Sequence, residues 1–132
     1  MNYCKIGGRA YDVNVTDIEE TFNILYSDQT GRTMEDGAEI SLDPIGTFFG
    51  HKITFKRKNG NEREFDDLLD YVSSPRTDGI DVEIVHNQST ISYKAYISTG
   101  ARKLEKIDVN SNKVLWGEFT LNITPMKAQV IS

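Results

Sequence analysis

The chain has very few of the residues that provide covalent cross-links or anchor a protein in a membrane. Its 132 residues include a single cysteine, Cys4, so no disulfide can form within the chain. No run of apolar residues approaches the ~18 positions that a membrane-spanning helix requires, and the first residues lack the apolar core of a secretory signal. A disulfide-stapled scaffold and a helical membrane span are therefore excluded, and we expect a protein that is not secreted.

Histidine is almost as scarce, and the sequence contains only His51 and His86. Neither lies at metal-ligand spacing from a second histidine, a cysteine or a carboxylate. We expect His51, on an apolar strand face, to be a hydrogen-bonded core or rim residue, and His86, at a strand end, to be exposed. Cys4 has no local catalytic motif around it, and the acidic residues do not follow the pattern of a calcium loop. The sequence thus predicts a non-enzymatic protein with no metal site and no cofactor.

Basic residues are outnumbered by acidic ones, and the net charge is −5. This balance argues against a nucleic-acid or anionic-membrane surface. The charge is also uneven, since residues 1–50 and 64–83 are strongly acidic whereas 51–63 and 84–132 are basic. Two interpretations stay open: ordinary solvated faces, or a subunit whose acidic surface meets a basic surface on its neighbour.

Most of the sequence alternates between apolar and polar residues with the period of β-strands. Alternating stretches lie at about residues 3–6, 11–15, 22–26, 47–58, 80–84, 91–97 and 115–123. The first two flank Gly7 and Gly8, which predicts a short N-terminal hairpin. Leu104 and Ile107 mark a separate, weaker strand.

One segment has the helical period instead. Its apolar residues share one helix face: Phe65, Leu68, Leu69 and Val72. Asn61 followed by Glu64 predicts a capping box at the helix start, and Pro75 ends the helix. We therefore expect a single domain over residues 1–132. Its fold is mainly β, either a sandwich or a partly open barrel, with one flanking amphipathic helix at about 62–74.

A long segment without strand or helix periodicity interrupts the β pattern at about residues 28–46. Structureless segments of this length are uncommon inside compact domains and are usually functional or mobile. Because the segment has few large apolar residues, we expect a partner to order it. Trp116 breaks the alternation of its strand and is expected to point opposite Phe119 and Leu121. It packs under the helix or lies in an interface, where tryptophan is enriched.

A set of short segments is distributed along nearly the whole chain: 8–13 (GRAYDV), 22–25 (FNIL), 31–32 (GR), 43–48 (DPIGTF), 65–68 (FDDL), 73–75 (SSP), 93–97 (YKAYI) and 116–117 (WG), with a proline-containing tail. Taken together, their order and spacing resemble a family of small prophage-encoded proteins. These come from the tail regions of long-tailed phages that infect low-GC Gram-positive bacteria.

This resemblance implies a non-enzymatic virion structural protein of the phage tail: a tube, distal-tail or baseplate component. It also implies a tail-tube-like fold that assembles into rings, in which the long loop reaches a neighbouring subunit. The expected partners are copies of the chain and other phage tail proteins, without a membrane or sequence-specific nucleic acid, and the expected location is the virion. The candidate interface residues are Gln29, Arg32, Met34, Glu35, Glu39 and Trp116.

An alternative function is a ligand-binding module, such as a glycan-binding adhesin, on the same β scaffold. It is motivated by the frequent use of sandwich domains as adhesins and by tyrosines such as Tyr96, which we expect to be exposed. This alternative requires a concave aromatic patch on one exposed face of the sheet.

Overall fold

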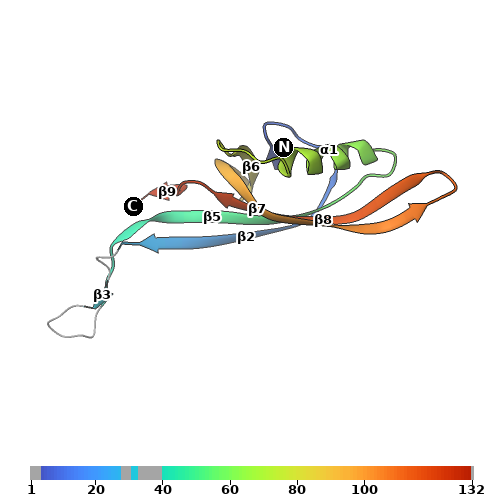
Figure 1. The fold of residues 1–132 in the computed structure, drawn as a ribbon. Coiled ribbons are helices and arrows are strands. Elements are labelled where there is room, and N and C mark those ends of the chain that lie inside the picture. The colour runs from blue at the N-terminus through green and yellow to red at the C-terminus, as the bar shows by residue number, and fades with distance from the viewer. Residues whose placement is uncertain (1–3, 28–30, 33–39, 132) are drawn as a thin grey trace.

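The computed structural model describes residues 4–27, 31–32 and 40–131. Its elements are β1 (Cys4–Ile6), β2 (Asn14–Tyr26), β3 (Gly31–Arg32), β4 (Ile40–Ser41), β5 (Pro44–Lys56), α1 (Glu62–Val72), β6 (Ile80–His86), β7 (Ser89–Asp108), β8 (Lys113–Pro125) and β9 (Val130–Ile131). The prediction of a mainly β fold with one flanking helix is therefore confirmed (Figure 1).

Seven of the strands form one open antiparallel sheet with the order β1-β6-β7-β8-β5-β2, and β9 pairs with the beginning of β5. Strands β3 and β4 form a separate two-stranded sheet. Figure 1 shows that the long strands extend in two directions from the centre. The β2–β5 pair forms one arm, and the β7–β8 hairpin forms the other.

The hydrophobic core lies between α1 and one face of the sheet (Figure 1). Phe65, Leu68 and Val72 of α1 are buried, as the helical spacing predicts. The Phe65 ring meets the Phe119 ring of β8 edge-on, with 6.1 Å between ring centres. The other buried apolar residues of the described chain come from the sheet: Ile6, Ile53, Phe55, Ile80, Val82, Ile84, Ala95, Leu121 and Ile123.

The sheet curls so strongly that its two ends approach each other on the core side. Glu20 of β2 reaches His86 at the end of β6, and 2.7 Å separates the carboxylate oxygen from the ring nitrogen. Strands β7, β8 and β5 lie between β2 and β6 in the sheet order. The fold is thus a partly open barrel whose gap is bridged by side chains rather than by a strand ladder.

The start of α1 differs from the sequence prediction. Asn61 occupies the N-cap position, but its side chain makes no capping hydrogen bond. Its amide nitrogen donates instead to Asp12, at 2.6 Å, and Lys58 binds the same carboxylate. The predicted capping box is therefore wrong, because a tertiary contact to the segment before β2 captures the Asn61 side chain. The helix also ends at Val72 rather than near residue 74.

The predicted N-terminal hairpin is confirmed only at its turn. Gly7 and Gly8 have positive φ angles of 62° and 78°, and Ile6 and Arg9 on either side of them exchange backbone hydrogen bonds of 3.0 and 3.2 Å. The expected pairing of the two flanking strands is wrong, because β1 pairs with β6, with Cys4 opposite Ile84, and β2 pairs with β5. After this single bridge the Arg9 side chain binds Glu64 of α1.

The segment expected to be a long loop is partly strand. Strand β5 already begins at Pro44, so the last three residues of the 28–46 segment belong to the sheet. Within the segment, β3 and β4 pair with each other. The weak strand expected around Leu104 is a continuation of β7, which runs for 20 residues without interruption.

Candidate assembly interface

Strand β2 forms one edge of the sheet, and no other strand within the described ranges pairs with its outer side. Of its 13 residues, only Ile18 is half-buried and the rest are exposed. Natural sheets usually protect an edge with proline, lysine, a bulge or a covering element. Strand β2 contains no proline and no lysine, and its register with β5 is regular over residues 17–25. Its outer backbone N–H and C=O groups are therefore available to a further strand.

The free end of the β2–β5 arm is unusually apolar for a surface. The exposed apolar residues there are Phe22, Ile24, Leu25, Tyr26, Leu42, Ile45, Val130 and Ile131. The Phe22 side chain is the most exposed of those on β2, at 65%. Contiguous exposed apolar surface on a small protein usually marks a contact with another macromolecule. The arm thus combines an open strand edge with an apolar surface.

The two arms differ in charge. Strand β2 carries three acidic side chains and no basic one. The outer part of the β7–β8 hairpin, residues 101–116, carries four basic and two acidic side chains. The acidic side chains of β2 lie in its first half and β5 contributes Lys52 and Lys56, so the free end of this arm is apolar rather than acidic, whereas the other arm is basic. Two unlike arms suit a head-to-tail contact.

The sequence-predicted interface residues are only partly within the described structure. Gln29, Met34, Glu35 and Glu39 lie outside the described residues. Arg32 belongs to β3, where its backbone is paired opposite Ile40. The short β3–β4 sheet places Arg32 beyond the end of the β2–β5 arm (Figure 1).

Trp116 is described fully, and its predicted direction is wrong. From Phe119 to Trp116 strand β8 advances three residues, while β7 advances only two from Arg102 to Leu104. This extra residue turns Trp116 to the same face as Phe119, where it packs half-buried against the core. The Arg102 guanidinium lies 4.1 Å from the Trp116 ring centre and also binds Asp66 of α1 at 2.9 Å. Trp116 thus lies on the helix side of the sheet; its contribution to an interface stays a prediction.

A polar cluster inside the curl of the sheet was not predicted from the sequence. It consists of Glu20, His51, His86 and Tyr93, which we call the histidine cluster. The buried His51 ring lies 2.9 Å from the Glu20 carboxylate through Nε2 and 2.6 Å from the Tyr93 hydroxyl through Nδ1. Because Nε2 donates to the carboxylate, Nδ1 of a neutral ring accepts from Tyr93. The prediction of a hydrogen-bonded core histidine is confirmed for His51, whereas His86 is half-buried rather than exposed.

The ionisation of the histidine cluster follows from burial and these hydrogen bonds. Burial lowers the pKa of His51 below its ordinary value, although the Glu20 carboxylate acts in the opposite direction. Burial alone would raise the pKa of Glu20, but the hydrogen bonds from His86 and His51 outweigh it and the pKa is lowered. Burial raises the pKa of Tyr93 well above its usual range. These directions favour a neutral His51 beside an ionised Glu20. Such a hydrogen-bonded pair stabilises the fold.

The cysteine, histidine and carboxylate side chains show no sign of a reactive or metal-binding site within the described residues. Burial raises the pKa of the Cys4 thiol to about 12, which leaves almost no thiolate nucleophile at neutral pH. Within residues 4–27, 31–32 and 40–131, no three histidine, cysteine or carboxylate side chains are arranged to hold a metal ion. The one described helix is too short and too polar to cross a bilayer.

Comparison with known proteins adds no relative. No protein-family model matches the chain, and no curated protein matches it.

Proposed function

We propose that this chain is a non-enzymatic structural subunit that assembles with copies of itself through the open edge of β2 and the apolar end of the β2–β5 arm. The observation that supports this most is the 13-residue edge strand, which is exposed along nearly its whole length, contains no proline or lysine, and keeps a regular register with β5 over residues 17–25. A solitary protein with such an edge would be prone to uncontrolled strand pairing, so a dedicated partner strand is the simplest explanation of its persistence.

The segment order along the chain supports a particular setting for this assembly, the tail of a long-tailed phage or prophage particle. In this setting the subunit is a virion component of the tube, distal tail or baseplate. Head-to-tail contacts that close by rotation give a ring, and the apolar end of the β2–β5 arm and the basic β7–β8 arm supply two different surfaces for such a contact. Strand β3 lies past the end of the β2–β5 arm (Figure 1), and in this proposal it is the part that contacts a neighbouring subunit.

The test is the mass of the protein in solution, measured by light scattering after size exclusion, together with negative-stain microscopy. We expect the wild-type chain to form an oligomer or ring. Phe22→Lys places a charge on the exposed β2 edge, so we expect it to shift the population toward monomers without unfolding the domain.

Met126→Lys is the matched control, because Met126 is 45% exposed in the segment after β8 and lies outside both arms. It makes the same kind of chemical change and should leave the mass unaltered. A wild-type chain that stays monomeric at the highest soluble concentration and binds no other tail protein contradicts the proposal. If the oligomer stays intact in Phe22→Lys, the subunits contact each other through a surface other than β2.

A further inference from the structure

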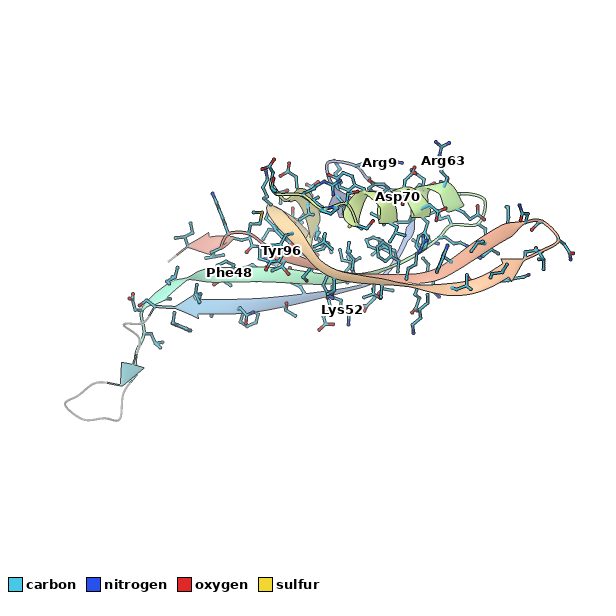
Figure 2. All side chains as sticks on the ribbon, viewed as in Figure 1. Arg9, Phe48, Lys52, Arg63, Asp70 and Tyr96 are labelled. Carbon is cyan, nitrogen blue, oxygen red and sulfur yellow. The ribbon has the colours of Figure 1, made fainter. Side chains whose placement is uncertain are left out.

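The face of the sheet that points away from α1 carries a groove of about 690 Å³ across four strands. Its lining residues are Glu19, Thr21, Asn23, Ile24, Leu25, Phe48, Gly50, His51, Lys52, Tyr96, Asn122, Ile123, Thr124 and Pro125. The volume falls within the range of ordinary small-molecule sites. Figure 2 labels three of these residues, Phe48 and Lys52 on β5 and Tyr96 on β7.

The groove results from one glycine in the interior of a long strand. On β5, the residues whose side chains face away from the core alternate with His51 and Ile53, and Gly50 is one of them. Thr21 of β2 lies opposite Gly50 in the ladder, and Tyr96 of β7 lies opposite Thr124 of β8. Gly50 therefore adds no side chain to a row that crosses the sheet, and the Thr21 hydroxyl lies beside it, 3.3 Å from where a Cβ would stand. A glycine inside a strand often marks the place where a ligand or a backbone approaches closely.

Apolar surface lines one end of the groove. The Tyr96 side chain is 49% exposed, although a tyrosine of this size is usually covered in a folded domain. Phe48, half-buried on β5, lines the same groove. Tyr96 on β7 and Phe48 on β5 are separated by β8, and both contribute apolar surface to the lining near Gly50. The groove thus has two aromatic side chains in its lining.

The polar groups around the rings are uncharged or balanced. Glu19 and Lys52 lie directly opposite each other in the β2–β5 ladder, so their charges offset within the groove. Asn122 donates from its side-chain amide to the Thr99 hydroxyl at 2.7 Å, which orients that amide at the groove. Asn23 adds a second amide on the β2 side. Amides and hydroxyls beside aromatic rings suit a ligand with many hydroxyl groups and an apolar ring face.

We propose that this groove binds a segment of a neutral oligosaccharide, with a sugar ring over Gly50, its C–H face against Tyr96, and its hydroxyls bonded to the amides. The absence of a net charge among the lining side chains disfavours an anionic glycan or a nucleic-acid backbone. A peptide strand would seek the β2 edge, where backbone groups are available, rather than the face of the sheet. The groove borders the proposed assembly contact, since Ile24 and Leu25 of β2 belong to both, but its centre lies on the face of β5, β8 and β7 rather than on the β2 edge.

The test is calorimetric titration of the intact chain, in whichever oligomeric state it has, with maltohexaose, cellohexaose and chitohexaose. We expect at least one of them to bind, and Tyr96→Ala to weaken that binding about three- to tenfold through the loss of ring stacking. Met126→Ala is the matched control, since Met126 is 45% exposed, does not line the groove and lies outside both arms. It should change the affinity by less than about twofold.

A second variant, Gly50→Val, fills the groove and should abolish binding. A Cβ at this position would lie 3.3 Å from the Thr21 hydroxyl, so the thermal unfolding of Gly50→Val is compared with that of the wild-type chain. If Gly50→Val does not fold, Tyr96→Ala decides the test. No heat from any of the three sugars at about 10 mM overturns the proposal. Equal affinities of Tyr96→Ala and the wild-type chain for the sugar also overturn it. So does tighter binding of the anionic hexasaccharide hexagalacturonate than of the neutral sugars. If Tyr96→Ala dissociates the oligomer, the groove is a protein contact and the proposal is also wrong.

Discussion

Glu20 on the edge strand β2 accepts a hydrogen bond from His86 at the end of β6, across the open side of the curled sheet, at 2.7 Å. The same carboxylate oxygen accepts from the buried His51. One acidic side chain therefore connects the edge strand to the opposite part of the sheet. Because β2 is also the strand we propose for assembly, the histidine cluster holds in place the strand that another subunit would meet.

The first prediction concerns pH. His51 has a folded-state pKa below its ordinary value of 6.5, so protons bind the unfolded chain more readily. Stability is then complete above about pH 6.5 and falls as the pH decreases through the folded pKa of His51. For one proton the slope cannot exceed about 1.4 kcal/mol per pH unit. Glu20 adds to the loss below its ordinary pKa of 4.5. Urea unfolding at a series of pH values measures the effect.

His51→Gln is the control for this prediction, because glutamine retains a donor and an acceptor but does not titrate. Its unfolding free energy should be lower at neutral pH and should change less between about pH 7 and pH 5. A wild-type chain whose stability is constant over that interval would show that His51 is not held neutral by burial.

The second prediction compares two neighbouring leucines of α1. The helical spacing places Leu68 and Leu69 on the same apolar stripe, but Leu68 has no exposed surface and Leu69 is half-buried. Leu68→Ala leaves a cavity and should cost about 2–5 kcal/mol of unfolding free energy. Leu69→Ala should cost clearly less, because its side chain already contacts water. Equal losses in urea unfolding would contradict the packing of α1 described above.

The third prediction concerns the turn after β1. Gly7 has a φ of +62°, and a Cβ added there would collide with the Tyr71 ring of α1. Gly8 has a φ of +78° but open space around it. Gly8→Ala should therefore lower the unfolding free energy by only about 1–2 kcal/mol, the cost of holding alanine in the left-handed conformation. Gly7→Ala should cost more, since Tyr71 must also move. Thermal unfolding of the two variants measures the difference, which is the steric contribution of Tyr71. A smaller loss of stability in Gly7→Ala than in Gly8→Ala would refute this prediction.

The fourth prediction concerns Arg32 in β3. We expect Arg32→Ala to change stability by less than about 0.5 kcal/mol, as substitutions outside the core usually do. If the β3–β4 extension contacts a neighbour, Arg32→Ala weakens assembly in light scattering while its unfolding curve stays that of wild type. Lys127→Ala, at an exposed position outside both arms, is the matched control and should affect neither measurement. An Arg32→Ala chain that unfolds at a lower urea concentration would mean that the extension packs on its own subunit.

Local periodicity was enough to predict most of the elements. Apolar residues at every second position place Ile53 and Phe55 inside, and those at helical spacing place Phe65 and Leu68 inside. These outcomes follow from the geometry of a strand and a helix, in which side-chain direction repeats at a fixed interval. The mainly β class and the single helix could be read from the chain for the same reason.

Pairing between distant segments could not be read in this way. Strand β1 joins β6 rather than its sequence neighbour β2, and Asn61 binds Asp12 instead of capping its own helix. Both choices depend on groups that are far apart along the chain and are brought together only by folding. Short-range rules had favoured the hairpin and the capping box because those alternatives require no long-range contact.

The sequence by itself determined the identity of the strands and the helix, the acidic and basic segments, and the buried stripe of α1. Only the tertiary structure decided which edge stays open, which face keeps a hollow at Gly50, and which four polar residues form the histidine cluster. The tertiary structure also decided that Trp116 turns toward the core. The extra residue of β8 that turns it is defined only by how β8 pairs with β7. Side-chain direction is a local property of the backbone, whereas register, curl and edge exposure depend on how all the strands pair at once.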